Sequence, residues 1–145
     1  MDLASLTGWL GFLLIGATIS LPYIVRKPRV ANSARPAPKG NASFLDRMRP
    51  HAYLGYIILA LVVGHAYLAM TAATMSRSNQ TGIWLATLAL IAIVAQAAVG
   101  RQLLERQYPQ RRTLRGYHFW TMAAVVILVL GHTLLNGSML QAMGQ

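Results

Sequence analysis

The four histidines of this chain fall into two pairs with the same internal spacing. His51 and His65 begin and end the segment HAYLGYIILALVVGH, and His118 and His132 begin and end the segment HFWTMAAVVILVLGH. Each pair is fourteen residues apart, and the second pair follows the first by 67 residues. On an α-helix, fourteen residues rise about 21 Å and turn about 1400°, which is close to four full turns. The two histidines of a segment therefore lie on nearly the same side of one helix, far apart along its axis.

Imidazole groups in this pattern are suited to binding iron in two places. If the two segments run in the same direction and face each other, His51 meets His118 at one end and His65 meets His132 at the other. We call the first the inner pair, since it lies beside the basic connections of the chain, and the second the outer pair. The separation of about 21 Å within each helix excludes a single zinc or di-metal site built from all four rings. Two pairs stacked along the helices instead fit two six-coordinate haems, in which each iron takes one imidazole from each helix.

The absence of cysteine limits the kind of haem. Covalent attachment through a C-x-x-C-H motif is excluded, so the sequence predicts two non-covalent haem b groups. Two other interpretations stay open: the histidines hydrogen-bond across helices, or they form part of a proton relay. Either would make the chain a haem-free structural or proton-conducting membrane subunit. Neither explains why both segments use the same interval and phase.

Polar residues near each histidine pair are candidates to bind the haem propionates. Arg49 lies two residues before His51 and Arg115 lies three before His118, and guanidinium groups are suited to pair with carboxylates. Anchoring to lipid head groups explains the same two arginines as well. The candidates at the outer pair are Ser76, Arg77, Asn79, Thr81 and Asn136.

A quinone is a second candidate ligand. It would bind near aromatic residues that flank the histidines, namely Tyr53, Tyr67, Tyr117 and Trp120. Anchoring of aromatic side chains at the membrane interface accounts for these residues equally well.

The histidines lie in a chain whose apolar residues form four long blocks. The chain has 145 residues, of which 55% are hydrophobic, and the blocks cover roughly 3–25, 51–74, 82–104 and 116–136. Each block comes near or exceeds the ~20 residues that a helix needs to cross a bilayer, and helices satisfy their own backbone hydrogen bonds there. The third block has only one strongly polar residue, Gln96, whereas a soluble bundle would show a polar stripe. The sequence predicts one all-α transmembrane domain over residues 1–145, a four-helix bundle embedded in the membrane.

The distribution of basic residues predicts the topology. Loop 26–50 carries seven, and loop 105–115 together with the end of the preceding block carries five, whereas Arg77 stands alone on the opposite side. Since basic loops stay in the cytoplasm, both termini should lie on the outer side of a bacterial-type inner membrane. The first block lacks a basic leader, so we interpret it as a retained helix. Topology explains the net charge of +10, and no nucleic-acid partner is expected.

This pattern resembles the diheme transmembrane cytochrome b class. Four helices, with His51 and His65 on the second and His118 and His132 on the fourth, are similar to the haem-binding core of respiratory cytochrome b and of ferric-reductase-like membrane domains. The resemblance implies two bis-histidine haems and electron transfer across or within the membrane.

The chain lacks two parts that a self-sufficient enzyme of this class would have. It carries neither a flavin or nicotinamide fingerprint nor an additional bundle with a quinol-oxidation motif. We therefore expect a non-catalytic electron-transfer subunit of an oxidoreductase complex. Its partners would be other subunits of that complex and, as a candidate, a quinone.

Overall fold

The computed structural model describes residues 3–26, 48–71, 78–105 and 109–137, and all four segments are helical. The helices are α1 (Leu3–Arg26), α3 (Arg49–Thr71), α4 (Gln80–Leu104) and α5 (Arg111–Asn136). All four are long and apolar enough to cross a membrane, with mean hydropathies of 1.6, 1.8, 2.1 and 1.8. Length and apolar character together indicate a multi-pass membrane protein.

The start of α5 differs from the prediction. The helix begins at Arg111, five residues before the predicted start at 116, so Arg111, Arg112 and Arg115 lie on the helix and not in a loop over 105–115. No proline or glycine interrupts the segment RRTLR, and arginine and leucine are good helix formers. The Arg111 side chain also donates to the Leu103 carbonyl at 2.8 Å, which satisfies one of the last carbonyls of α4.

The start of α3 lies close to its predicted position. The helix begins at Arg49, two residues before the predicted start at 51, and Pro50 lies in its first turn, where a missing N–H removes no hydrogen bond of the helix. Its predicted end at residue 74 falls outside the described residues.

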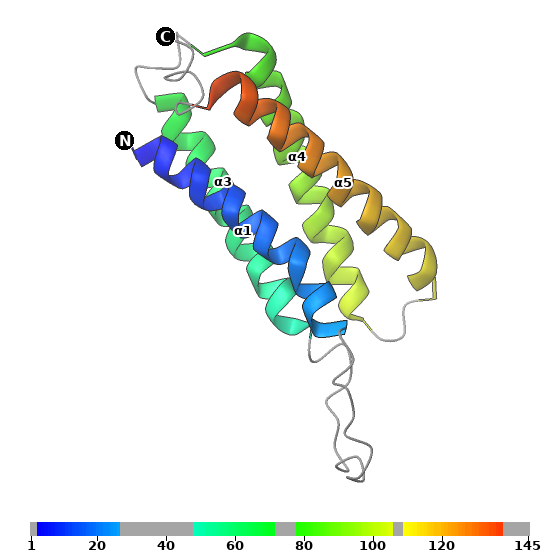
Figure 1. The fold of residues 1–145 in the computed structure, drawn as a ribbon. Helices are drawn as coiled ribbons and strands as arrows, with labels where there is room; N and C mark the ends of the chain where they lie inside the picture. The colour runs from blue at the N-terminus through cyan, green and yellow to red at the C-terminus, as the bar shows by residue number, and fades with distance from the viewer. Residues whose placement is uncertain (1–2, 27–47, 72–77, 106–108, 138–145) are drawn as a thin grey trace.

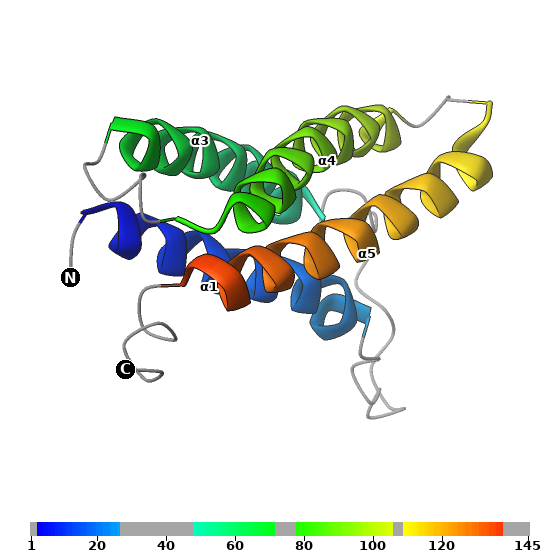
Figure 2. The same ribbon diagram turned by 90° about the horizontal axis from the view of Figure 1, so that it is seen from above.

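The helices form two antiparallel pairs. Helix α1 packs along α3 and α4 packs along α5, and a smaller contact joins the pairs through α3 and α4 (Figure 1). Figure 2 shows α3 and α4 on one side of the bundle and α1 and α5 on the other, so α3 and α5 lie diagonally across the interior. These two helices run in the same direction, and the start of α1 lies at the same end of the bundle as the end of α5 (Figure 1).

Few described side chains are buried, and the outer surface is apolar. The buried hydrophobic residues are Ile58, Ala89, Ile93, Leu114 and Val125. Large apolar side chains such as Leu13, Ile91 and Ile127 point outward and are exposed. A soluble protein would rarely expose so much contiguous apolar surface, whereas a bilayer covers it.

Two asparagines join α4 and α5 at one end of the bundle. The Asn79 backbone N–H donates to Asn136 Oδ1 at 2.7 Å, and Asn136 Nδ2 donates to the Asn79 carbonyl at 3.2 Å. Asn79 is also the N-cap of α4, since its side chain accepts from the Gly82 N–H at 3.2 Å. These bonds fix the end of α5 that carries His132 against the start of α4.

Candidate functional site

The structure brings the four histidines together in two pairs. The ring centroids of His51 and His118 are 6.1 Å apart, with an angle of 68° between the ring planes. Those of His65 and His132 are 6.4 Å apart, at 73°. Two imidazoles that bind one metal ion from opposite sides, each through a nitrogen–metal bond of about 2 Å, place their centroids roughly 6 Å apart. Both pairs therefore have the spacing that shared coordination requires.

At the outer pair, both rings are held through Nδ1 by backbone carbonyls of the neighbouring helix. His65 Nδ1 lies 2.9 Å from the Ala4 carbonyl and 3.3 Å from Thr7 Oγ1, both on α1. His132 Nδ1 lies 2.9 Å from the Gly82 carbonyl on α4. A ring that donates its Nδ1–H to a carbonyl carries its lone pair on Nε2, which is the usual arrangement of a metal-binding histidine.

At the inner pair, His51 is held in the same way, by a carbonyl that a proline leaves without its helical N–H. His51 Nδ1 lies 3.1 Å from the Thr18 carbonyl on α1. In an uninterrupted helix that carbonyl would accept the N–H of residue 22, but residue 22 is Pro22, which has no N–H. Pro22 thus releases a carbonyl of α1 inside the span, where the imidazole of His51 binds it.

His118 is held differently. Its Nε2 lies 3.2 Å from Gln96 Nε2, and the Thr121 hydroxyl donates to Gln96 Oε1. Its Nδ1 is buried and has no hydrogen-bond partner among the described residues. The ring nitrogens of the inner pair therefore bond to Thr18 and Gln96 and not to each other within this part of the chain.

Two glycines allow the neighbouring helices to approach the rings closely. A Cβ atom at Gly8 on α1 would lie 2.9 Å from Cε1 of His65, which is too close without a shift of the ring. A Cβ atom at Gly100 on α4 would lie 3.3 Å from Cε1 of His118. The histidine-free helices α1 and α4 therefore have a shared role, because each supports the two rings of its partner helix.

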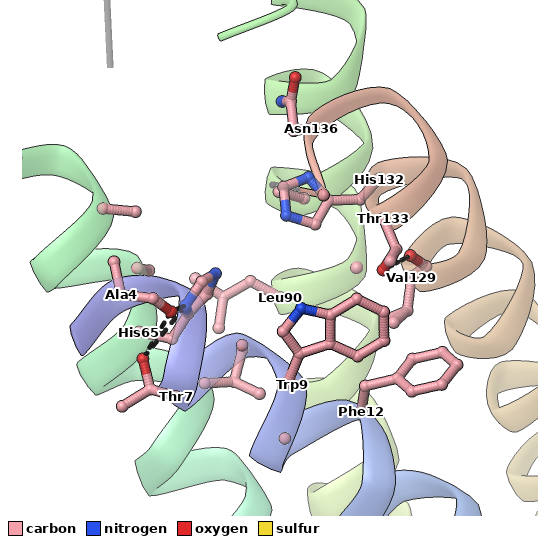
Figure 3. Close-up of a pocket in the computed structure, with 18 of the residues that line it drawn as sticks. Ala4, Thr7, Trp9, Phe12, His65, Leu90, Val129, His132, Thr133 and Asn136 are labelled. Carbon is pink, nitrogen blue, oxygen red and sulfur yellow. Dashed lines mark hydrogen bonds between the residues drawn. The ribbon is translucent and has the colours of Figure 1, made fainter. Parts of the chain in front are cut away.

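A cavity of about 760 Å³ lies at the outer pair, between the two helix pairs. The rings of His65 and His132 point toward each other across it, each with one nitrogen on the facing side (Figure 3). Trp9 and Phe12 of α1 and Asn136 of α5 contribute to its wall (Figure 3). This volume is within the ~300–1,000 Å³ typical of cofactor and small-molecule sites.

The predicted propionate partners lie at the ends of the same helices. Arg49 is the first residue of α3, and Arg115 precedes His118 by three residues and so lies on the same side of α5. Both side chains are exposed. At the outer end Asn136 lines the cavity and is bonded to Asn79, while Thr81 is exposed on the first turn of α4. Ser76 and Arg77 lie outside the described residues.

The aromatic residues predicted near a quinone lie on the surface of the bundle. Tyr53, Tyr67, Tyr117 and Trp120 are all exposed. They stay candidates for contact with quinone, lipid or another subunit.

No described group of three or more His, Cys, Asp or Glu side chains could hold a metal ion, so the histidine pairs are the candidate ligand sets in this part of the chain. No family model, curated protein or solved structure matches this chain.

Several supporting residues were not predicted from the sequence. The carbonyls of Ala4, Thr18 and Gly82 orient three of the rings, and Gly8 allows α1 to lie close to the ring of His65. A signal for part of this exists, since Thr18 follows Ala4 by fourteen residues and Gln96 follows Gly82 by fourteen, the same interval as the histidines.

Proposed function

We propose that this chain is a diheme b-type cytochrome subunit that transfers electrons across or within a membrane as part of a redox complex. One observation carries the proposal: two histidine pairs, with ring centroids 6.1 and 6.4 Å apart, lie at opposite ends of the same two parallel helices. Two isolated polar contacts between helices would not require this repeated spacing, whereas two iron atoms bound between the helices would.

The residues present fit haem b. The donor set is four imidazoles without thiolate, and three of the four rings are held by carbonyls that leave the lone pair on Nε2. The cavity between the helix pairs has the volume of a cofactor site. His51 with His118 and His65 with His132 would bind the two irons, and Arg49 and Arg115 would pair with inner propionates. Haem iron supplies one-electron chemistry, whose potential its axial ligands and their hydrogen bonds adjust.

The protein's own contribution is position, orientation and insulation. The interval of fourteen residues places the pairs about 21 Å apart along the helices, one near each end of the span. Helices α1 and α4 hold three of the rings through backbone carbonyls and the fourth through Gln96. An electron that crosses the membrane here couples to the potential at about 2.3 kcal/mol per 100 mV.

The proposal includes an orientation and partners. The described helix ends beside His51 and His118 are basic, with Arg49, Arg101, Arg111, Arg112 and Arg115, and this favours the cytoplasm for that end, both termini outside, and a bacterial-type inner membrane. Electrons would enter and leave through other subunits of the complex or through a quinone at the exposed aromatic residues.

Electron transfer across vesicles tests this function. Purified protein is reconstituted into liposomes that contain ferricyanide, and a reductant that cannot cross the membrane is added outside. We expect the trapped ferricyanide to be reduced faster than in protein-free liposomes, and the enhancement to be lost in a His65→Ala variant. Haem-loaded protein that gives no enhancement in sealed vesicles would contradict transfer across the membrane.

A haem-free membrane subunit is the alternative, and one contact favours it. The bond between Gln96 and His118 Nε2 engages the nitrogen that would bind iron. In that case the histidines would be structural or proton-conducting groups, and the purified protein would be colourless.

A further inference from the structure

Gln96 occupies a distinct place in the repeat of the two helix pairs. Thr18 lies fourteen residues after Ala4, and Gln96 lies fourteen after Gly82, so Gln96 in α4 corresponds to Thr18 in α1. Thr18 supports its histidine through a backbone carbonyl, whereas Gln96 contacts His118 through its side-chain amide. The inner site is therefore asymmetric, although the histidine spacing is not.

A difference one turn further along explains this asymmetry. Residue 22 in α1 is proline, which leaves the Thr18 carbonyl without its helical N–H. The corresponding residue in α4 is Gly100, which keeps the N–H that the helix uses to engage the carbonyl of Gln96. A Cβ atom at Gly100 would also lie 3.3 Å from Cε1 of His118. His118 Nδ1 consequently has no acceptor among the described residues.

The Gln96 amide uses the nitrogen that would bind iron. If Thr121 donates to Gln96 Oε1, the amide N–H donates to the lone pair of His118 Nε2. If the Thr121 hydroxyl instead donates to the Tyr117 carbonyl at 2.8 Å, the amide can turn over, and Nε2 carries a proton that Gln96 Oε1 accepts. In both orientations Nε2 is engaged, so Gln96 and iron compete for one atom.

The contact with Gln96 favours the arrangement in which His118 is not bound to iron. This hydrogen bond stabilises the unligated ring, whereas the buried Nδ1 has no partner among the described residues and gains none when Nε2 binds iron, so Gln96 is the contact that distinguishes the two states. At His132 the hydrogen bond to the Gly82 carbonyl is made through Nδ1, which leaves Nε2 for iron.

We propose that His118 is an exchangeable ligand: at the inner site it gives way to a small neutral diatomic ligand, and Gln96 binds the released imidazole. This inference rests on the proposed function, because it concerns the ligand of a bound haem. The proposal predicts a difference between the two sites: an added ligand would replace His118 at the inner iron, whereas both histidines of the outer site would stay bound.

Carbon monoxide is the probe. It is titrated into the reduced, haem-loaded protein, and binding is followed by the absorption spectrum. We expect one of the two haems to bind it, and the same amount per chain to bind to His65→Ala, which lacks the outer ligand. In Gln96→Leu the affinity should fall roughly twofold to tenfold, because His118 no longer has a competing partner and binds iron more firmly.

Two variants complete the test. Thr121→Val removes the hydroxyl that orients the amide and should lower carbon monoxide affinity by a smaller factor, so the test does not depend on the folding of one variant. Gln102→Leu makes the same substitution six residues later on α4 and should leave the affinity unchanged. In protein that contains two haems, this inference would be overturned if carbon monoxide bound to neither haem or to both. It would also be overturned if Gln96→Leu bound carbon monoxide with the affinity of the parent protein. Each of these results would leave the proposed function intact. A protein without haem would overturn the proposed function itself.

Discussion

His65→Ala should remove one haem and leave the other in place. The substitution deletes one of the two axial ligands of the outer site, and the remaining ring of His132 cannot bind iron from both sides. The inner pair is about 21 Å away along the helices and has its own supports, so it should keep its haem. We expect the haem content to fall from two per chain to one, measured as the pyridine haemochrome against protein concentration.

The complementary substitution at the inner site is the control. His51→Ala should also leave one haem per chain, but with the spectrum and potential of the outer site, and the double variant should bind none. Two residual haems in His65→Ala would contradict the ligand assignment. Simultaneous loss of both haems from a variant that elutes from gel filtration like the parent protein would contradict two independent sites.

Gly8→Val should have nearly the same effect without touching a ligand. A Cβ atom at position 8 already approaches Cε1 of His65 to 2.9 Å, and the two γ-methyl groups of valine require still more space. The ring would have to leave the position in which Nδ1 bonds to the Ala4 carbonyl and in which its other nitrogen is on the side of His132 (Figure 3). We expect loss of most of the outer haem, read from haem content and from the spectrum of the remaining site.

Gly16→Val is the matched control for this substitution. Gly16 lies eight residues later on α1, is exposed, and a Cβ atom there meets nothing within 4 Å among the described residues. The two variants make the same change in helix propensity on the same helix, so a difference between them reports the contact with His65. Equal haem content in both would show that α1 does not control the outer ring.

The spans and the meeting of the histidines in pairs could be predicted because both depend on side-chain type and spacing. Apolar blocks of sufficient length indicate the helices, and an interval of fourteen residues places His51 and His65 on one face. The structure shows both pairs at similar separations.

The supports of the rings could not be predicted in the same way. Backbone carbonyls such as those of Ala4 and Gly82 belong to every residue, so no residue type marks them as acceptors. Pro22 is an exception, because a proline inside a span releases the carbonyl four residues earlier. The predicted start of α5 at residue 116 is wrong because the hydrophobic pattern begins only after the arginines. Those arginines favour the helix, which begins at Arg111.

Haem analysis of the purified wild-type chain tests the central proposal most directly. The protein, expressed with an adequate haem supply and purified in mild detergent, should show a reducible b-type absorption spectrum and contain two haem b groups per chain. A folded, helical preparation that is colourless and binds no added haem would show that the paired imidazoles serve another purpose.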